Sequence, residues 1–182
     1  LRQIFIWTGG HPYLTQRLCY AVASTPGISG KRGVDKVCHN MFFSNRARER
    51  DDNLLFVRER LLRSEADLIN LLRLYRRVHR STHFRKLLPF RLTLRRIEPV
   101  ADEEANPLVG VLRLSGVAKV EMGLLRVRNP IYWRVFDLAW VEANMPVAEL
   151  WRRWLILWGA IKRAGKFIAA VVFLLVLVAT AI

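Results

Sequence analysis

VAKVEMGLLRVRNPIYWRVF, residues 117–136, carries the clearest structural signal in the chain. Residues 117–120 and 124–127 are short runs rich in valine and leucine, and valine in particular favours β-strands. The three residues between these runs end in Gly123, which readily adopts the positive φ that a tight turn needs. The pattern therefore predicts a β-hairpin.

A helix is predicted directly after the hairpin. Asn129 is a favourable cap for its N-terminus, and Pro130 occupies the first helical position, where its missing N–H costs nothing. Because several helices are predicted before the hairpin, the order of elements favours a winged-helix domain over residues 64–143. The apolar face of the helix after the hairpin is formed by Ile131, Val135, Leu138 and Val141.

The chain before the hairpin has the pattern of short amphipathic helices, so the fold class is mainly α. We expect residues 1–63 to form a small helical domain. Ser64 is predicted to cap the next helix, whose apolar stripe runs from Leu68 to Val78. The other predicted helices cover residues 12–23, 34–43, 53–63 and 108–114. The predicted loops cover residues 24–33 and 44–52, and residues 82–107 are expected to form a loop with short elements.

Residues 167–182, FIAAVVFLLVLVATAI, carry no charge. A helix needs about 20 apolar residues to cross a bilayer core. The run is somewhat shorter than that and reaches the last residue, so it predicts a truncated transmembrane helix. Lys162, Arg163 and Lys166 flank it, which by the positive-inside rule predicts a single span with a cytoplasmic N-terminal domain. The alternative is a buried C-terminal helix of a soluble protein.

Residues 144–166 predict a juxtamembrane helix. Trp151, Trp154 and Trp158 recur at the spacing of one helical stripe, and tryptophan favours the headgroup layer of a membrane. The alternative is a helix that packs on the cytoplasmic domain. In the membrane interpretation, the anchor residues are Trp151, Trp154, Trp158, Lys162, Arg163 and Lys166.

The chain is strongly basic, with 30 Lys and Arg residues against 15 Asp and Glu residues and a formal net charge of +15. A basic domain attracts polyanions, which include anionic lipid, nucleic acid and acidic protein surfaces. For a domain tethered to a membrane, anionic lipid is the simplest partner. Cys38-His39 is an isolated pair without the repeated spacing of a zinc site, so no metal site is predicted.

Residues 7–16, WTGGHPYLTQ, resemble the Gly-x-Pro segment of STAND-type (AAA-like) NTPases. Residues 56–62 (FVRERLL), 112–117 (LRLSGV) and 123–136 (GLLRVRNPIYWRVF) are similar to later segments of the same family. The resemblance covers about residues 4–143. It implies the small helical domain and the winged-helix domain that follow the nucleotide-binding core, with a winged helix that packs within the protein.

The resemblance also implies a nucleotide-dependent switch. In that family the Gly-x-Pro turn lies against the nucleotide, so Gly10 and Pro12 are expected to contact ATP or ADP, with Gly9 and His11 adjacent. A glycine turn before a helix N-terminus also suits an anionic group. The alternative is that Gly10 and Pro12 simply begin a helix. An upstream nucleotide-binding domain would hold the nucleotide with Mg²⁺, and the protein could form homo-oligomers.

Catalytic residues are not predicted within this chain. No phosphate loop of the form G-x-x-x-x-G-K-[ST] occurs in the sequence. Residues 27–32, GISGKR, have a shorter glycine spacing and carry Arg32 where a hydroxyl would hold Mg²⁺, so we expect a flexible loop there. No Ser/His/Asp or Cys/His constellation stands out, and whether the parent protein hydrolyses ATP stays open.

Two functions fit these patterns. The first is the regulatory, signal-transducing region of a membrane-anchored STAND-type NTPase from a bacterial sensing or defence system. The second is a membrane-tethered winged-helix regulator that binds DNA, with Arg126 and Arg128 in the wing. Residues 108–114, LVGVLRL, contain one arginine among mostly apolar side chains, so this helix has few groups that could contact bases in the major groove. The first function is therefore favoured.

Overall fold

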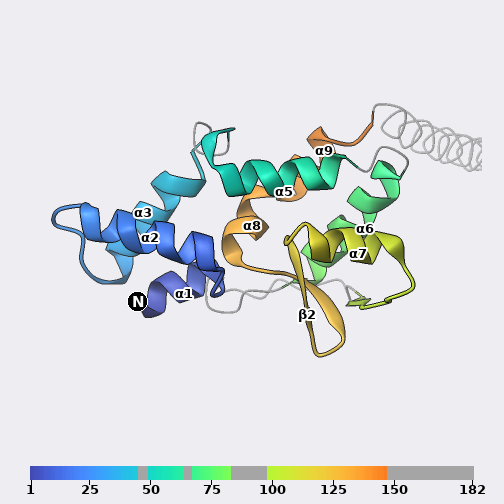
Figure 1. The fold of residues 1–182 in the computed structure, drawn as a ribbon, viewed down its shortest axis with the longest axis horizontal. Helices are drawn as coiled ribbons and strands as arrows, with labels where there is room; N and C mark the ends of the chain where they lie inside the picture. The colour runs from blue at the N-terminus through green and yellow to red at the C-terminus, as the bar shows by residue number, and fades with distance from the viewer. Residues whose placement is uncertain (45–48, 64–66, 83–97, 147–182) are drawn as a thin grey trace, which may run out of the picture. The chain divides into compact units, whose positions relative to one another are not determined.

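The computed structural model describes residues 1–44, 49–63, 67–82 and 98–146. These residues are mainly helical, with one small antiparallel sheet (Figure 1). Residues 1–144 form one compact unit and residues 145–182 a second. The division of the first unit into two domains at residue 63 stays a prediction.

Three helices come first and pack on one another: α1 (Arg2–Thr8), α2 (Pro12–Ser24) and α3 (Gly30–Phe42). Helix α3 begins at Gly30, so residues 30–33 are helical and the predicted loop is shorter than expected. The Ile28 side chain packs against the first turn of α3 at Gly33. A Cβ at Gly33 would lie only 2.9 Å from it, so the absence of a side chain there leaves room for this packing. The loop expected at residues 27–32 is therefore wrong in its second half.

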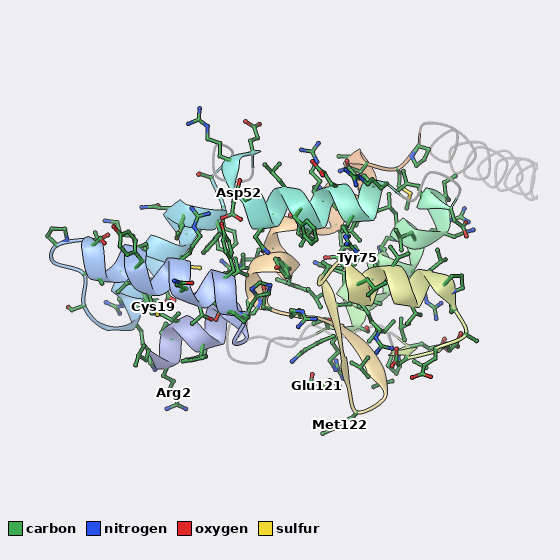
Figure 2. The ribbon with its side chains drawn as sticks, viewed as in Figure 1. Arg2, Cys19, Asp52, Tyr75, Glu121 and Met122 are labelled. Atoms are coloured by element: carbon green, nitrogen blue, oxygen red, sulfur yellow. The ribbon has the colours of Figure 1, made fainter. Side chains whose placement is uncertain are left out.

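Two further helices follow, α5 (Asp52–Leu62) and α6 (Leu68–Ser81). Helix α6 begins at Leu68 with Asp67 as its N-cap residue, and the predicted cap, Ser64, lies outside the described residues. The apolar stripe of α6 is buried apart from its first residue, Leu68, which is half-buried. Tyr75, labelled in Figure 2, is fully buried, and its hydroxyl donates to the Phe136 carbonyl at 2.9 Å.

The sheet contains β1 (Val100–Ala101), β2 (Ala118–Glu121) and β3 (Leu124–Val127) in the order β1-β3-β2. The predicted hairpin is confirmed, and Met122 and Gly123 at its tip both have positive φ, 53° and 72°. This pair of positive φ angles is typical of the two-residue turns that match strand twist. Strand β1 was not predicted, because two residues are too few to show a strand pattern.

Three short helices complete the unit: α7 (Pro107–Leu114), α8 (Pro130–Val135) and α9 (Leu138–Ala143). Asn129 caps α8 as predicted, with its side chain accepting the Tyr132 N–H at 2.8 Å. The single helix expected after Asn129 is wrong, because α8 ends at Val135 and a second helix, α9, begins at Leu138. Asp137 then caps α9 by accepting the Trp140 N–H at 2.8 Å.

The predicted membrane-associated segments lie almost wholly outside the described residues, which end at residue 146. This applies to the transmembrane helix over residues 167–182 and to all but the first three residues of the juxtamembrane helix over 144–166. No helix in the described part of the chain is long and apolar enough to cross a bilayer. The predicted anchor residues, Trp151, Trp154, Trp158, Lys162, Arg163 and Lys166, also lie outside that part.

Candidate functional site

The turn formed by residues 9–12, called the GGHP turn below, joins α1 to α2 and rests on the start of α8. Gly9 has a φ of 58°, and its N–H donates to the Phe5 carbonyl at 2.9 Å to close α1. A Cβ at Gly9 would lie 2.9 Å from the Arg128 carbonyl oxygen and 3.2 Å from Asn129 Cβ. Glycine is therefore needed both for this backbone conformation and for the close approach to α8.

His11 adds a second contact between the GGHP turn and α8. Its ring meets the Tyr132 ring edge-on, with the centroids 5.9 Å apart. Burial, and secondarily the nearby Arg128 guanidinium, lower the pKa of His11 below its usual value. His11 also caps α2, and a neutral imidazole suits this role, because Nδ1 must accept the Leu14 N–H, here at a long 3.5 Å.

Gly10 and Pro12 lie on the outer side of the GGHP turn. Both are exposed, and a Cβ at Gly10 would find no atom within 4 Å. The Gly10 N–H donates to the buried Thr8 hydroxyl at 3.3 Å, and Pro12 is the first residue of α2. The four predicted site residues are thus contiguous, with Gly9 and His11 against α8 and with free space beside Gly10.

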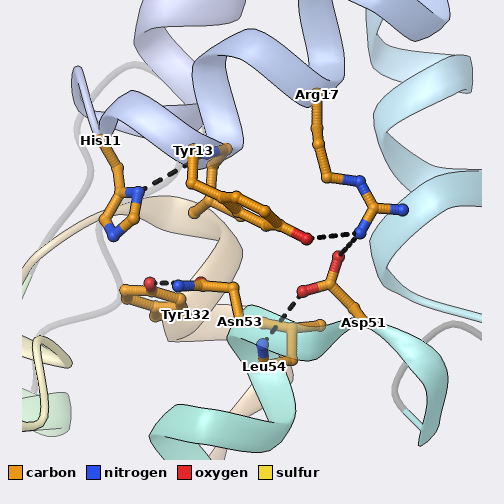
Figure 3. A network of polar contacts seen from close by, with 8 residues as sticks. His11, Tyr13, Arg17, Asp51, Asn53, Leu54 and Tyr132 are labelled. Atoms are coloured by element: carbon orange, nitrogen blue, oxygen red, sulfur yellow. Dashed lines mark hydrogen bonds and ion pairs between the residues drawn. The ribbon is translucent and has the colours of Figure 1, made fainter.

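A partly buried ion pair fixes α2 against the start of α5 (Figure 3). Arg17 Nη1 donates to Asp51 Oδ2 at 2.6 Å and also to the Tyr13 hydroxyl at 2.9 Å. The other Asp51 oxygen accepts the Leu54 N–H at 3.0 Å and so caps α5. The Asp51 side chain is only 2% exposed, so its charge depends on these contacts.

A second link runs from α8 to α5, also drawn in Figure 3. The Tyr132 hydroxyl donates to Asn53 Oδ1 at 2.6 Å, and burial raises the pKa of Tyr132 to about 12. The tyrosine therefore stays a neutral hydrogen-bond donor. Through this link and the His11 contact, α8 is held between the GGHP turn and α5.

The segment just before α8 joins the GGHP turn to the hairpin. Arg128 Nε donates to the Gly116 carbonyl at 2.7 Å, and the Arg128 N–H donates to the Val117 carbonyl at 2.9 Å. Asn129 is fully buried, and its Nδ2 group has no hydrogen-bond partner within the described structure. Residues 128 and 129 therefore contact both the GGHP turn and the base of the hairpin.

These links had no counterpart in the sequence reasoning. Asp51 follows a charged stretch that predicted only a loop, and Asn53 and Tyr132 are separated by 79 residues. Asn129 was predicted as a cap, but nothing in its local pattern indicates that it touches Gly9. Such pairings depend on how the helices pack, which local spacing does not encode.

A separate cleft of about 430 Å³ lies beside α8. Its clearest feature is the stacked pair His79 and Trp133, whose rings are 5.0 Å apart and parallel to within 3°. His79 Nε2 lies 2.8 Å from the Trp133 carbonyl oxygen, and burial lowers the pKa of His79. The lining residues are His39, Phe43, His79, Trp133, Arg134 and Asp137.

The GGHP turn offers groups for binding and none with a clear catalytic role. It presents backbone atoms, a helix start and a proline ring to the outside. Within the described residues, no group of three or more His, Cys, Asp and Glu side chains could hold a metal ion.

Protonation of His11, which is half-buried, and of His79, which is buried, should destabilise the fold. The pKa of both His11 and His79 is lowered in the folded state, so the unfolded chain binds protons more readily. The free energy of unfolding should fall as pH drops below about 6.5, and level off once the folded-state pKa values are passed. Urea unfolding at several pH values, followed by tryptophan fluorescence, measures this loss.

Substitution separates these histidines from other titrating groups. The double variant His11→Asn/His79→Gln should lose most of the pH dependence, since neither new side chain titrates. His39→Gln, at an exposed position, serves as the matched control. Equal pH profiles for the double variant and the control would contradict the assignment.

No family model matches the chain, and no solved structure matches it. The chain is similar to an uncharacterized WD repeat-containing protein of Synechocystis sp., with 29% identity over 160 residues. The match covers 80% of this chain but only 12% of the relative. The similarity therefore relates this chain to one segment of a much longer protein.

Proposed function

We propose that this chain is the regulatory region of a membrane-anchored STAND-type NTPase and acts as a nucleotide-dependent conformational switch. The observation that carries the proposal is the seating of Gly9 against the backbone of residues 128 and 129, at a distance that leaves no room for a side chain. A turn that touches nucleotide on one side would thus touch the hairpin-and-helix region on the other.

The two sides of the GGHP turn have different tasks in this proposal. Gly10 and Pro12, which are exposed, contact ATP or ADP held with Mg²⁺ by an upstream nucleotide-binding domain. Gly9 and His11 transmit any displacement to α8, because Gly9 lies against residues 128 and 129 just before the helix and His11 contacts Tyr132 in its first turn. Exchange of the nucleotide would then shift α8 and the hairpin relative to α1.

The similarity to a WD repeat-containing protein adds a possible source of the signal. WD repeats form β-propellers, whose repeated blades serve in many proteins as binding surfaces. In the proposed parent protein, a WD-repeat region would recognise a partner and the region described here would respond. The apolar run at residues 167–182 would hold the assembly at the membrane, and homo-oligomers would be one form of output.

The DNA-binding alternative has less support. The basic side chain on the helix before the hairpin, Arg113, pairs with Asp102 at 3.4 Å. In the wing, Arg126 Nη1 donates to the Ser81 carbonyl at 3.1 Å, and Arg128 holds the Gly116 carbonyl. Arginines that are engaged within the fold are poorly placed to read bases, so the switch is favoured.

Nucleotide binding tests the proposal. A chain extended upstream should bind labelled ATP and ADP, whereas the chain of 182 residues should not. In the extended chain, Pro12→Ala should weaken binding by about fivefold to tenfold, because a packed ring on the nucleotide is worth about 1 kcal/mol. Equilibrium titration with a fluorescent nucleotide measures the difference.

Pro26→Ala is the matched control, since Pro26 is an exposed proline in the loop between α2 and α3. It should leave affinity unchanged. Equal affinities for Pro12→Ala and the parent would remove Pro12 from the site. Salt-sensitive binding of duplex DNA without nucleotide binding would instead support the tethered regulator.

A further inference from the structure

An arginine without an acidic partner lines the cleft of about 430 Å³ beside α8, which is called the α8 cleft below. The Arg134 guanidinium carbon lies 4.8 Å from the centre of the Trp7 ring and 5.5 Å from the centre of the Phe43 ring. Among the residues that the structure describes, Arg134 forms no ion pair and its side chain donates no hydrogen bond. Two aromatic rings thus hold this cation in place, while its N–H donors stay available to a ligand.

A carboxylate in the same cleft also has an oxygen to spare. Asp137 Oδ1 accepts the Trp140 N–H at 2.8 Å and so caps α9. Within the described part of the chain, Oδ2 accepts no hydrogen bond, and Asp137 forms no ion pair with Arg134 or with any other residue. Opposite charges that line one cleft without pairing can be bridged by a ligand that carries both charges.

The wall of the α8 cleft is aromatic and fixed in position. His79 and Trp133 stack in parallel, and each ring also bonds to the backbone of the other residue. His79 Nε2 donates to the Trp133 carbonyl at 2.8 Å, since a carbonyl oxygen can only accept, and Trp133 Nε1 donates to the His79 carbonyl at 3.3 Å. Phe43 lines the same cleft. The cleft therefore offers a preformed, largely apolar surface between two charged groups.

We propose that the α8 cleft binds a free α-amino acid with an apolar or aromatic side chain. The Arg134 guanidinium binds the carboxylate of the amino acid in a two-pronged geometry, and Asp137 Oδ2 accepts from its ammonium group. The side chain of the amino acid packs on Phe43 and Trp133. A volume of about 430 Å³ lies within the range of about 300–1,000 Å³ that is usual for small-molecule sites.

A nucleotide suits this cleft less well than an amino acid does. The charges of Arg134 and Asp137 cancel, and the carboxylate repels a group with several negative charges, such as a polyphosphate. Gly10 and Pro12 do not line the cleft, so the inference goes beyond the nucleotide switch and does not depend on it. Trp133 and Arg134 belong to α8, so a bound amino acid contacts the helix whose start lies against the GGHP turn.

Three ligands that differ only in charge test this proposal on the full chain. L-phenylalanine carries both charges, 3-phenylpropanoate lacks the ammonium group, and 2-phenylethylamine lacks the carboxylate. Isothermal titration calorimetry measures the affinity for each. L-phenylalanine should bind about tenfold or more tightly than either analogue, because each analogue leaves one charged group of the cleft without its partner.

Two variants connect each charge of the ligand to one residue. Asp137→Asn keeps an amide oxygen for the α9 cap, and it should weaken L-phenylalanine binding about tenfold while leaving 3-phenylpropanoate binding unchanged. Arg134→Gln should weaken L-phenylalanine binding by a similar factor and leave 2-phenylethylamine binding unchanged. Arg2→Gln and Asp52→Asn, at exposed positions that do not line the cleft, are the matched controls and should bind as the parent does.

Three results would overturn the assignment of the α8 cleft. The first is the absence of L-phenylalanine binding at concentrations up to about 10 mM. The second is equal affinity for L-phenylalanine and 3-phenylpropanoate, which would show that the ammonium group is not recognised. The third is binding of ATP that is tighter than that of L-phenylalanine and is weakened by Arg134→Gln, which would assign the cleft to nucleotide instead.

Discussion

Replacing Asp51 with alanine is expected to lower the free energy of unfolding by about 2–4 kcal/mol. The change removes the partner of Arg17 at 2.6 Å and leaves the Leu54 N–H at the start of α5 uncapped. The Arg17 side chain is 40% exposed and regains water, so the cost stays below that of a fully buried pair. Urea unfolding followed by circular dichroism measures the loss.

The neighbouring residue supplies the control. Asp52 lies in the first turn of α5 and is exposed (Figure 2), so Asp52→Ala should change stability by less than about 0.5 kcal/mol. Asp51→Asn should be intermediate, because an amide oxygen still caps the helix but the charge is gone. Equal losses for Asp51→Ala and Asp52→Ala would show that the ion pair contributes nothing.

Replacing Gly9 with alanine should cost about 2–4 kcal/mol, for two reasons. The φ of 58° is unfavourable for any residue with a Cβ. The new Cβ would also lie 2.9 Å from the Arg128 carbonyl oxygen, which is backbone and cannot rotate away. The GGHP turn and the start of α8 must therefore separate, and thermal unfolding should show a lower midpoint.

Gly10→Ala isolates the first reason, the strained backbone. Gly10 also has a positive φ, 77°, but open space surrounds its Cβ position. Its cost should be limited to the backbone strain of about 1 kcal/mol. If the two variants lose the same stability, the close approach of Gly9 to α8 does not hold the GGHP turn in place.

Local chemistry was predictable from the sequence where a few adjacent residues determine it. The hairpin needed only two apolar runs and Gly123, and the start of α8 needed only Asn129 and Pro130. The buried stripe of α6 followed from helical spacing alone. In each case the interactions that form the element join residues close together in the sequence, at most a few positions apart.

The sequence did not predict the split of the last helix or strand β1. The apolar spacing from Ile131 to Val141 fits one helix, yet the structure has two, because Asp137 caps a second helix. Ile131, Val135 and Val141 are buried all the same, so their spacing does not reveal the break. Strand β1 exists because Val100 and Ala101 pair with β3, more than 20 residues away. Neither feature changes the local pattern of apolar residues, so periodicity could not reveal it.

The candidate site was predictable only in part. The residues of the GGHP turn were identified by their likeness to a family segment, and the turn itself by its glycines. Its contact with α8 joins residues nearly 120 positions apart, and no local signal predicts it. Yet the proposed switch depends on this contact, because it joins the GGHP turn to the segment that leads into α8.

Hydrogen–deuterium exchange on the upstream-extended protein tests whether nucleotide exchange moves the GGHP turn and α8 together. Exchange is compared with bound ADP and with a non-hydrolysable ATP analogue. Amide protection should change together at residues 9–13 and 129–135, because in the proposed switch the GGHP turn and α8 move as connected parts. Nucleotide-dependent changes confined to the upstream segment, with residues 129–135 unaffected, would contradict it.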